Sequence, residues 1–210
     1  DQNVTSCNVS NGQVSANVAG TTRGFDFYWF NGNPAVADSL SANFKGAVWS
    51  GRPVGAYTVI AVTKATRCIS ARSTANVTDN TILPVITTFS VNQTSCNALA
   101  PNGQASADVG GITSGYKFRW FAGTDTTTFI AQGTTLTNRP AGTYTVKAIN
   151  IMTGCFAIRQ ITITNNIVTP VVTAAVDQNV TSCNVSNGQV SANVAGATAG
   201  FNFYWFNGNP

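Results

Sequence analysis

The sequence contains copies of itself. Residues 1–34 recur at 177–210 with three changes, and a divergent copy lies between them, in which Asn102-Gly103-Gln104 matches Asn11-Gly12-Gln13. The three changes are Thr21 to Ala197, Arg23 to Ala199 and Asp26 to Asn202. A chain that repeats at intervals of tens of residues builds one structural unit per interval, so the repeat sets the fold that all other features must fit.

The spacing between landmarks divides the chain into repeats. The distance from the Asn-Gly pair to the next Trp is 18 residues in all three copies, which indicates paired strands with a fixed register. Pro84 and Pro170 each precede an apolar stretch, and proline is tolerated at the start of a strand. We therefore predict a repeat without its leading strand at 1–82, a complete repeat at 83–168 and the first half of a third repeat at 169–210.

The strand pattern predicts the fold class. Only 9% of the residues are charged, and Val, Thr, Asn, Gly and aromatic residues dominate, which suits strands and tight turns. Phe25, Phe27 and Trp29 alternate with residues that vary between copies, so the aromatic face is assigned to the core and the other face to solvent. We predict an all-β chain of tandem Ig-like antiparallel β-sandwich repeats of about 85–90 residues, arranged as a rod. The pair Asn11-Gly12 predicts a type I′ hairpin turn.

Several large side chains are assigned to the structural core. Trp49 aligns with Leu136, and two large apolar residues at one position indicate burial rather than an exposed binding aromatic. Tyr57 and Tyr144 each follow a turn glycine and resemble a tyrosine corner, with a ligand-stacking tyrosine as the alternative. The predicted core residues are Trp29, Trp120, Trp205, Tyr57, Tyr144, Trp49 and Leu136, and the possible surface contacts are Tyr28 and Tyr204.

Each complete repeat has a cysteine near its beginning and another near its end. We predict disulfides Cys7–Cys68 and Cys96–Cys155, each within one repeat, with the partner of Cys183 beyond residue 210. Each bond would close a loop of about 60 residues and contribute roughly 4 kcal/mol. Unpaired structural thiols are the alternative. A disulfide framework indicates an oxidising compartment, so we expect an extracellular or cell-surface protein.

The composition lacks the side chains of most enzyme sites. The chain has no His, and all seven acidic residues are Asp. Nucleophilic triads, His-based metal sites and Glu general acids are therefore absent from it, and we predict no enzyme activity and no cofactor. Calcium at a site of neutral ligands is the metal alternative. The eleven Lys and Arg residues are scattered, and no apolar run is long enough to cross a membrane, so we expect neither nucleic acid as a partner nor a membrane span.

The motifs together resemble the SprB-type repeat of Bacteroidetes surface proteins. The resemblance rests on the order Cys, Asn-Gly-Gln-x-Ser-Ala, Phe-x-Phe-x-Trp, Gly-x-Tyr-Thr-Val and Cys, and it is strongest at Gly142–Val146. The family usually has Asp-Ala-Asn-Gly before the closing Cys, where this chain has Lys64-Ala65-Thr66-Arg67 and Ile151-Met152-Thr153-Gly154. The resemblance implies very long cell-surface adhesins, exported by the type IX secretion route, some of which form gliding-motility filaments.

We expect the chain to be a stalk or filament segment that serves cell-surface attachment. One alternative is a self-assembling fibre in which units exchange strands, and another is a carbohydrate-binding module. The expected partners are neighbouring repeats, other copies in a filament, or surface glycans. Because residues 177–210 repeat 1–34, we expect an array that alternates two repeat types with a period of 176 residues. The unpaired aromatic face of Phe201, Phe203 and Trp205 suggests that the array is longer than the given sequence.

Overall fold

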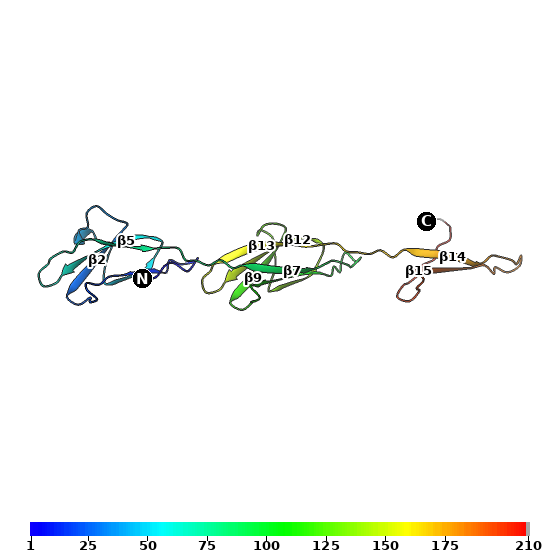
Figure 1. Ribbon diagram of the computed structural model, residues 1–210. Coiled ribbons are helices and arrows are strands. Elements are labelled where there is room, and N and C mark those ends of the chain that lie inside the picture. Colours follow the sequence, from blue (N-terminus) through cyan, green and yellow to red (C-terminus); the bar gives the residue numbers. More distant parts are fainter. Residues whose placement is uncertain (209–210) are drawn as a thin grey trace.

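The computed structural model describes residues 1–208 and contains three groups of strands that follow one another along a line (Figure 1). We call them the N-terminal sandwich, the middle sandwich and the C-terminal hairpin. The helical element of the described residues is a single 3-10 turn at Ser39–Ser41, which begins after Asp38 accepts a hydrogen bond from the Leu40 amide. The chain is therefore all-β, with antiparallel sheets, as predicted.

The middle sandwich consists of two facing sheets. One has the order β11-β8-β7 and the other β10-β9-β12-β13. Their strands are β7 (Ile86–Val91), β8 (Gly103–Val109), β9 (Tyr116–Ala122), β10 (Phe129–Gln132), β11 (Thr135–Arg139), β12 (Gly142–Asn150) and β13 (Phe156–Ile163). Alternate residues of each strand face inward, so Ile86 from one sheet and Trp120 from the other enter the same core. This is the seven-strand architecture of an Ig-like sandwich.

The N-terminal sandwich repeats this arrangement with one strand fewer. Its sheets have the orders β3-β2-β5-β6 and β1-β4. β1 corresponds to β8 of the middle sandwich, but no strand lies beside it in the place that β7 takes beside β8. Its strands are β1 (Gly12–Ser15), β2 (Phe25–Asn31), β3 (Phe44–Lys45), β4 (Val48–Arg52), β5 (Gly55–Thr63) and β6 (Ser73–Val77). Trp29, Trp49 and Tyr57 form its core together with Val14 and Val77.

Polar groups of the buried aromatic residues are satisfied by backbone carbonyls. The indole N–H of Trp120 donates to the Gly133 carbonyl at 2.9 Å, and Trp29 donates to Gly46 at 3.0 Å. The Tyr144 hydroxyl donates to the Pro140 carbonyl at 2.9 Å, and Tyr57 repeats this bond to Pro53 at 2.8 Å. Each tyrosine thus closes a corner of its sandwich, four residues from its acceptor.

The Asn11-Gly12 pair does not form the predicted type I′ hairpin, and that prediction is wrong. Gly12 begins β1 in an extended conformation, without a positive φ. A Cβ at Gly12 would lie 2.5 Å from a Val77 methyl group and 2.6 Å from the Arg52 carbonyl oxygen. Glycine is needed here because two neighbouring segments approach the backbone closely, and the local pattern cannot distinguish this from a turn.

The face of β2 and β9 opposite the core is less solvated than predicted. Phe30 and Phe121 point to this face, yet only 4% and 5% of their surfaces are exposed. In the middle sandwich Phe121 packs against Phe129 with ring centroids 6.0 Å apart. In the N-terminal sandwich the loop after β2 is held by a hydrogen bond from the Arg72 guanidinium to the Pro34 carbonyl. Neighbouring segments therefore cover aromatic side chains that alternation alone assigns to solvent.

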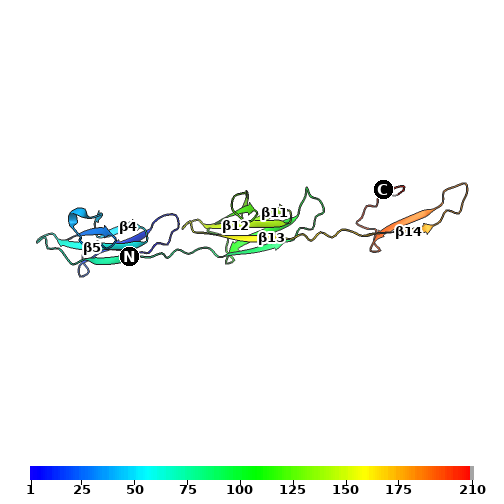
Figure 2. The same ribbon diagram turned by 90° about the horizontal axis from the view of Figure 1, so that it is seen from above.

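The C-terminal hairpin consists of β14 (Val172–Gln178) and β15 (Gln189–Val194) and has no facing sheet (Figure 2). Every residue of β14 is exposed. Trp205 is 56% exposed, whereas its counterparts Trp29 and Trp120 are fully buried. The assignment of Trp205 to the core is therefore wrong for this structure, because residues 201–206 form no strand to pack against the hairpin.

Candidate interface between the sandwiches

The N-terminal sandwich presents a loop, residues 5–11, toward the middle sandwich. The Asn11 side chain fixes this loop, since its oxygen accepts from the Thr5 amide at 2.9 Å and its nitrogen donates to the Thr5 hydroxyl at 2.8 Å. Asn102 makes the same pair of bonds with Thr94, and Asn187 makes them with Thr181. We call residues 5–11, 94–102 and 181–187 the opening loops. The role of this Asn is to hold the opening loop.

The middle sandwich presents the turn between β12 and β13. We call this turn, and the matching turn between β5 and β6 of the N-terminal sandwich, the closing loops. The Gly154 amide donates to the Asn150 carbonyl at 2.9 Å, and the Asn150 amide donates to the Cys155 carbonyl at 2.8 Å. Gly154 has φ +70°, a conformation that L residues other than Asn and Asp rarely adopt. The turn therefore places Cys155 immediately before β13.

The two loops are joined by a disulfide between Cys7 and Cys155, with Cα atoms 4.9 Å apart. The Cys7 amide donates to the Thr153 carbonyl at 2.8 Å, and the Ser6 hydroxyl donates to the same oxygen at 3.0 Å. The Asn8 side-chain amide occupies the space that a Cβ on Gly154 would need. Cys155 has no exposed surface. The contact is thus covalent, hydrogen-bonded and closely packed.

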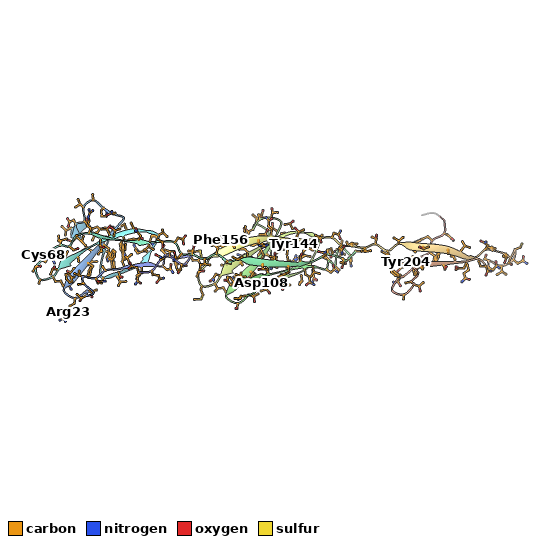
Figure 3. The ribbon with its side chains drawn as sticks, in the orientation of Figure 1. Arg23, Cys68, Asp108, Tyr144, Phe156 and Tyr204 are labelled. Atoms are coloured by element: carbon orange, nitrogen blue, oxygen red, sulfur yellow. A yellow bond between two sulfur atoms is a disulfide. The ribbon has the colours of Figure 1, made fainter. Side chains whose placement is uncertain are left out.

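The predicted pairing of Cys7 with Cys68 and of Cys96 with Cys155 is wrong. Cys68, Cys96 and Cys183 form no disulfide within residues 1–208 and are exposed. In each repeat the cysteine of the opening loop (Cys7 or Cys96) follows the leading strand. The cysteine of the closing loop (Cys68 or Cys155) precedes the last strand. The ends of these two strands are parallel, with bridges Val4–Asp79 and Gln93–Asn165, so the two cysteines of one sandwich lie at opposite ends. Figure 3 places Cys68 at the end of the N-terminal sandwich that faces away from the middle one.

The linker between the sandwiches lines a mostly apolar cleft beside this bond. Ile82, Leu83, Pro84 and Val85 form one side of it, and residues of the middle sandwich, including Tyr116, form the other. The cleft has few convergent polar groups of the kind that orient small ligands. The cleft therefore extends the contact between the two sandwiches from the disulfide to the linker.

The remaining predicted surface residues do not gather into a site. Tyr28 is half-buried, with the Lys45 ammonium 5.3 Å from its ring centroid, whereas Tyr204 follows the C-terminal hairpin and is 78% exposed (Figure 3). The Asp26 carboxylate lies 3.4 Å from the Lys45 ammonium and 3.7 Å from that of Lys64. A hydrogen bond with Tyr28, and secondarily the charge of Asp26, raise the pKa of Lys45.

Two further structural absences apply to the described residues. Residues 1–208 contain no group of three or more Cys or Asp side chains placed to hold a metal ion. No helix in this part of the chain is long and apolar enough to cross a membrane.

Sequence reasoning missed the residues around the disulfide, namely Ser6, Asn8, Thr153 and Gly154. A signal for three of these positions was available. Ser-Cys-Asn is present at all three opening loops, and Thr precedes the closing cysteine by two positions in both closing loops. Residues that stay the same beside the cysteines in every copy are expected to contact the segment to which the cysteine is bonded.

The comparisons with known proteins found only structural similarity. No family model and no curated protein matches the chain. A solved structure of an amphioxus IgVJ-C2 molecule matches over 78% of this chain and 98% of that one, with 14% identity and a TM-score of 0.31.

Proposed function

We propose that the chain is a segment of an extracellular rod of Ig-like repeats that serves attachment at a cell surface. The observation that carries this proposal is the Cys7–Cys155 disulfide, which joins one sandwich to the next beside the backbone linker. Two connections between neighbours restrict bending, whereas a single linker of a few residues leaves a hinge. A protein that spaces or attaches other parts needs such a fixed direction and needs no catalytic group.

The proposal includes export to an oxidising compartment and the absence of enzyme activity. A disulfide that joins two domains persists where thiols are not kept reduced, which supports a location outside the cell. The sandwich cores hold aromatic and aliphatic side chains, and the contact between them holds a linker rather than a pocket with reactive groups. The resemblance of the cysteine and Gly-x-Tyr-Thr-Val motifs to SprB-type adhesin repeats supports the same function.

Small-angle X-ray scattering of the oxidised chain and of a Cys7→Ser, Cys155→Ser variant tests the rod. We expect one extended particle for the oxidised chain, and for the variant a shorter average maximum dimension with a broader distribution, because the chain bends at residues 78–85. Equal profiles would contradict the role of the bond in setting direction. A glycan array tests the carbohydrate-binding alternative, and saturable binding that depends on Tyr28 would favour that function over a plain stalk.

A further inference from the structure

One face of the middle sandwich gathers cations that are far apart in the sequence. Trp120 and Val146 enter the core, so the residues next to them in β9 and β12 face outward. Among these, Arg119 lies directly opposite Lys147, and Lys117 lies two positions before Arg119 on the same side of β9. We call the outer side of the β10-β9-β12-β13 sheet around these three residues the cationic face. Like charges directly opposite each other on paired strands repel, so this arrangement is unfavourable by itself.

Neither acidic residue of the middle sandwich neutralises the cationic face. Asp108 lies on β8, in the opposite sheet (Figure 3). Asp125 lies in the loop between β9 and β10, where its carboxylate accepts hydrogen bonds from the amide of Thr127 at 2.9 Å and from the hydroxyl of the same residue at 2.7 Å. The ion pairs of residues 1–208 involve Lys45 and Lys64 and none of the three cations of this face. Its charge is therefore uncompensated in the described part of the chain.

The N-terminal sandwich shows that the fold does not need these cations. At the three matching positions, in the same strand register, it has Asp26, Tyr28 and Ile60. The Asp26 carboxylate is paired there with the ammonium groups of Lys45 and Lys64, at 3.4 and 3.7 Å. That face balances most of its own charge, whereas the cationic face does not. The cations of the middle sandwich therefore require an explanation other than the stability of the fold.

Aromatic rings hold two of the three cations in place. The Lys147 ammonium lies 3.7 Å from the ring centroid of Phe156, and the Arg119 guanidinium lies 4.8 Å from that of Phe129. These cation–π contacts restrict two long side chains, so less conformational entropy is lost when an anion binds to them. Phe129, Phe156 and the neighbouring Ile158 are each about half exposed. The cationic face therefore offers positive charge and apolar surface side by side.

This combination suits an acidic polysaccharide better than other polyanions. Its carboxylate or sulfate groups accept charge-assisted hydrogen bonds from Lys and Arg, and the apolar sides of its sugar rings can pack on Ile158. Single-stranded nucleic acid needs open aromatic faces on which its bases stack, but cations already cover one side of Phe129 and of Phe156. An anionic membrane needs apolar side chains that insert among its lipids, whereas the apolar residues of this face are half-buried in the sheet.

We propose that the cationic face of the middle sandwich binds an acidic polysaccharide through Lys117, Arg119 and Lys147. This inference rests on the proposed attachment function and names the class of molecule to which the rod attaches. It differs from a carbohydrate site at Tyr28, because that residue lies on the N-terminal sandwich, where the matching face pairs its charges. The attraction between exposed charges is screened by salt, so the binding weakens as the ionic strength rises.

The test is surface plasmon resonance of the full oxidised chain on dextran sulfate, polygalacturonate and uncharged dextran. We expect saturable, salt-sensitive binding to an acidic polymer and none to dextran, and the tighter of the two acidic polymers identifies the anionic group. The variant Arg119→Gln, Lys147→Gln should bind at least tenfold more weakly. The matched control Arg23→Gln, Arg67→Gln removes the same charge from exposed sites of the N-terminal sandwich and should bind as the unaltered chain does.

A second variant, Arg119→Lys with Lys147→Arg, keeps both charges and should retain the binding, whether or not the glutamine variant folds fully. The proposal is overturned by equal weakening in the glutamine variant and its control, or by no binding to either acidic polymer. It is also overturned by tighter binding to a poly(dT) oligonucleotide or to phosphatidylglycerol vesicles than to both polymers. Small-angle X-ray scattering of the same samples separates the two proposals, because an extended particle that binds no polysaccharide contradicts this inference and leaves the rod in place.

Discussion

Breaking the bond between the sandwiches should destabilise each of them, although neither contains both cysteines. When the N-terminal sandwich unfolds alone, Cys7 stays tied to the folded middle sandwich, which the backbone enters at Ile86. The bond then closes a loop of about 80 residues in the unfolded segment. On the chain-entropy model this loop contributes about 4.5 kcal/mol at 25 °C. That is a large part of the roughly 5–15 kcal/mol that stabilises a typical domain.

Hydrogen exchange read by mass spectrometry measures this effect for each sandwich separately. Peptides from β5 report on the N-terminal sandwich and peptides from β12 on the middle one. We expect reduction of the chain with a phosphine to lower the free energy of global opening of each sandwich by about 4–5 kcal/mol, while exchange in β14 is unchanged. Reduction keeps the side chains intact and so avoids the separate cost of a serine at the buried Cys155.

A Cys68→Ser variant is the matched control, because Cys68 is exposed and unbonded within the described residues. Its oxidised and reduced forms should differ by the same amount as those of the unaltered chain. If reduction changes the stability of the N-terminal sandwich by less than about 1 kcal/mol, the loop-closure reasoning is refuted. If the difference disappears in Cys68→Ser, the bond involves Cys68, and the pairing described above is refuted.

Four further predictions follow from individual contacts. Gly154→Ala should lower the bonded fraction of Cys7 and Cys155 in a glutathione buffer at least tenfold, whereas Gly123→Ala, with a similar φ but open space, should not. Tyr144→Phe should reduce the stability of the middle sandwich by about 1–3 kcal/mol in urea titrations, because the Pro140 carbonyl loses its donor. Burial raises the pKa of Tyr57 and Tyr144, so the folded state binds their protons more tightly than the unfolded state does. The stability that this binding contributes is present below about pH 10 and should be lost as the pH rises through the folded-state pKa. The double variant Tyr57→Phe, Tyr144→Phe should remove this decline. Amides of 185–208 should exchange far faster than those of β12 in a monomer, because no sheet covers the hairpin; equal protection would contradict this.

The sequence was sufficient for features that depend on one strand or one turn. The alternation of Phe25, Phe27 and Trp29 predicts an inward face, and a tyrosine just after a turn glycine predicts the corner bond, because both need only local geometry. Two local patterns misled. Asn11-Gly12 has the composition of a hairpin turn, but the glycine is needed because Val77, distant in the sequence, packs closely against it. The asparagine is needed because its side chain bonds to Thr5. The burial of Phe30 likewise depends on segments beyond its own strand.

The cysteine pairing was a matter of topology rather than spacing. The spacing of the two cysteines is similar in the two repeats, 61 residues from Cys7 to Cys68 and 59 from Cys96 to Cys155, and it fits a bond within the repeat as well as a bond between repeats. What distinguishes the two is strand direction: the closing cysteine precedes a last strand that ends parallel to the leading one, so it lies at the end where the chain enters. A complete count of strands in one repeat would have shown this, but the number of strands between Trp29 and Tyr57 cannot be read from that variable segment.

The position of Cys155 at the start of β13 has a mechanical consequence. When the chain is pulled from its two ends, tension passes from Cys7 through the disulfide to Cys155 and along β13, so the intervening residues of both sandwiches carry no load. Unfolding them then adds no length. Without the bond, the 148-residue separation would release up to about 500 Å at roughly 3.4 Å per residue. Residues 8–154 are therefore not extended by force in the oxidised chain, whereas they are in the reduced chain. The redox state of one bond determines how far this protein can be stretched.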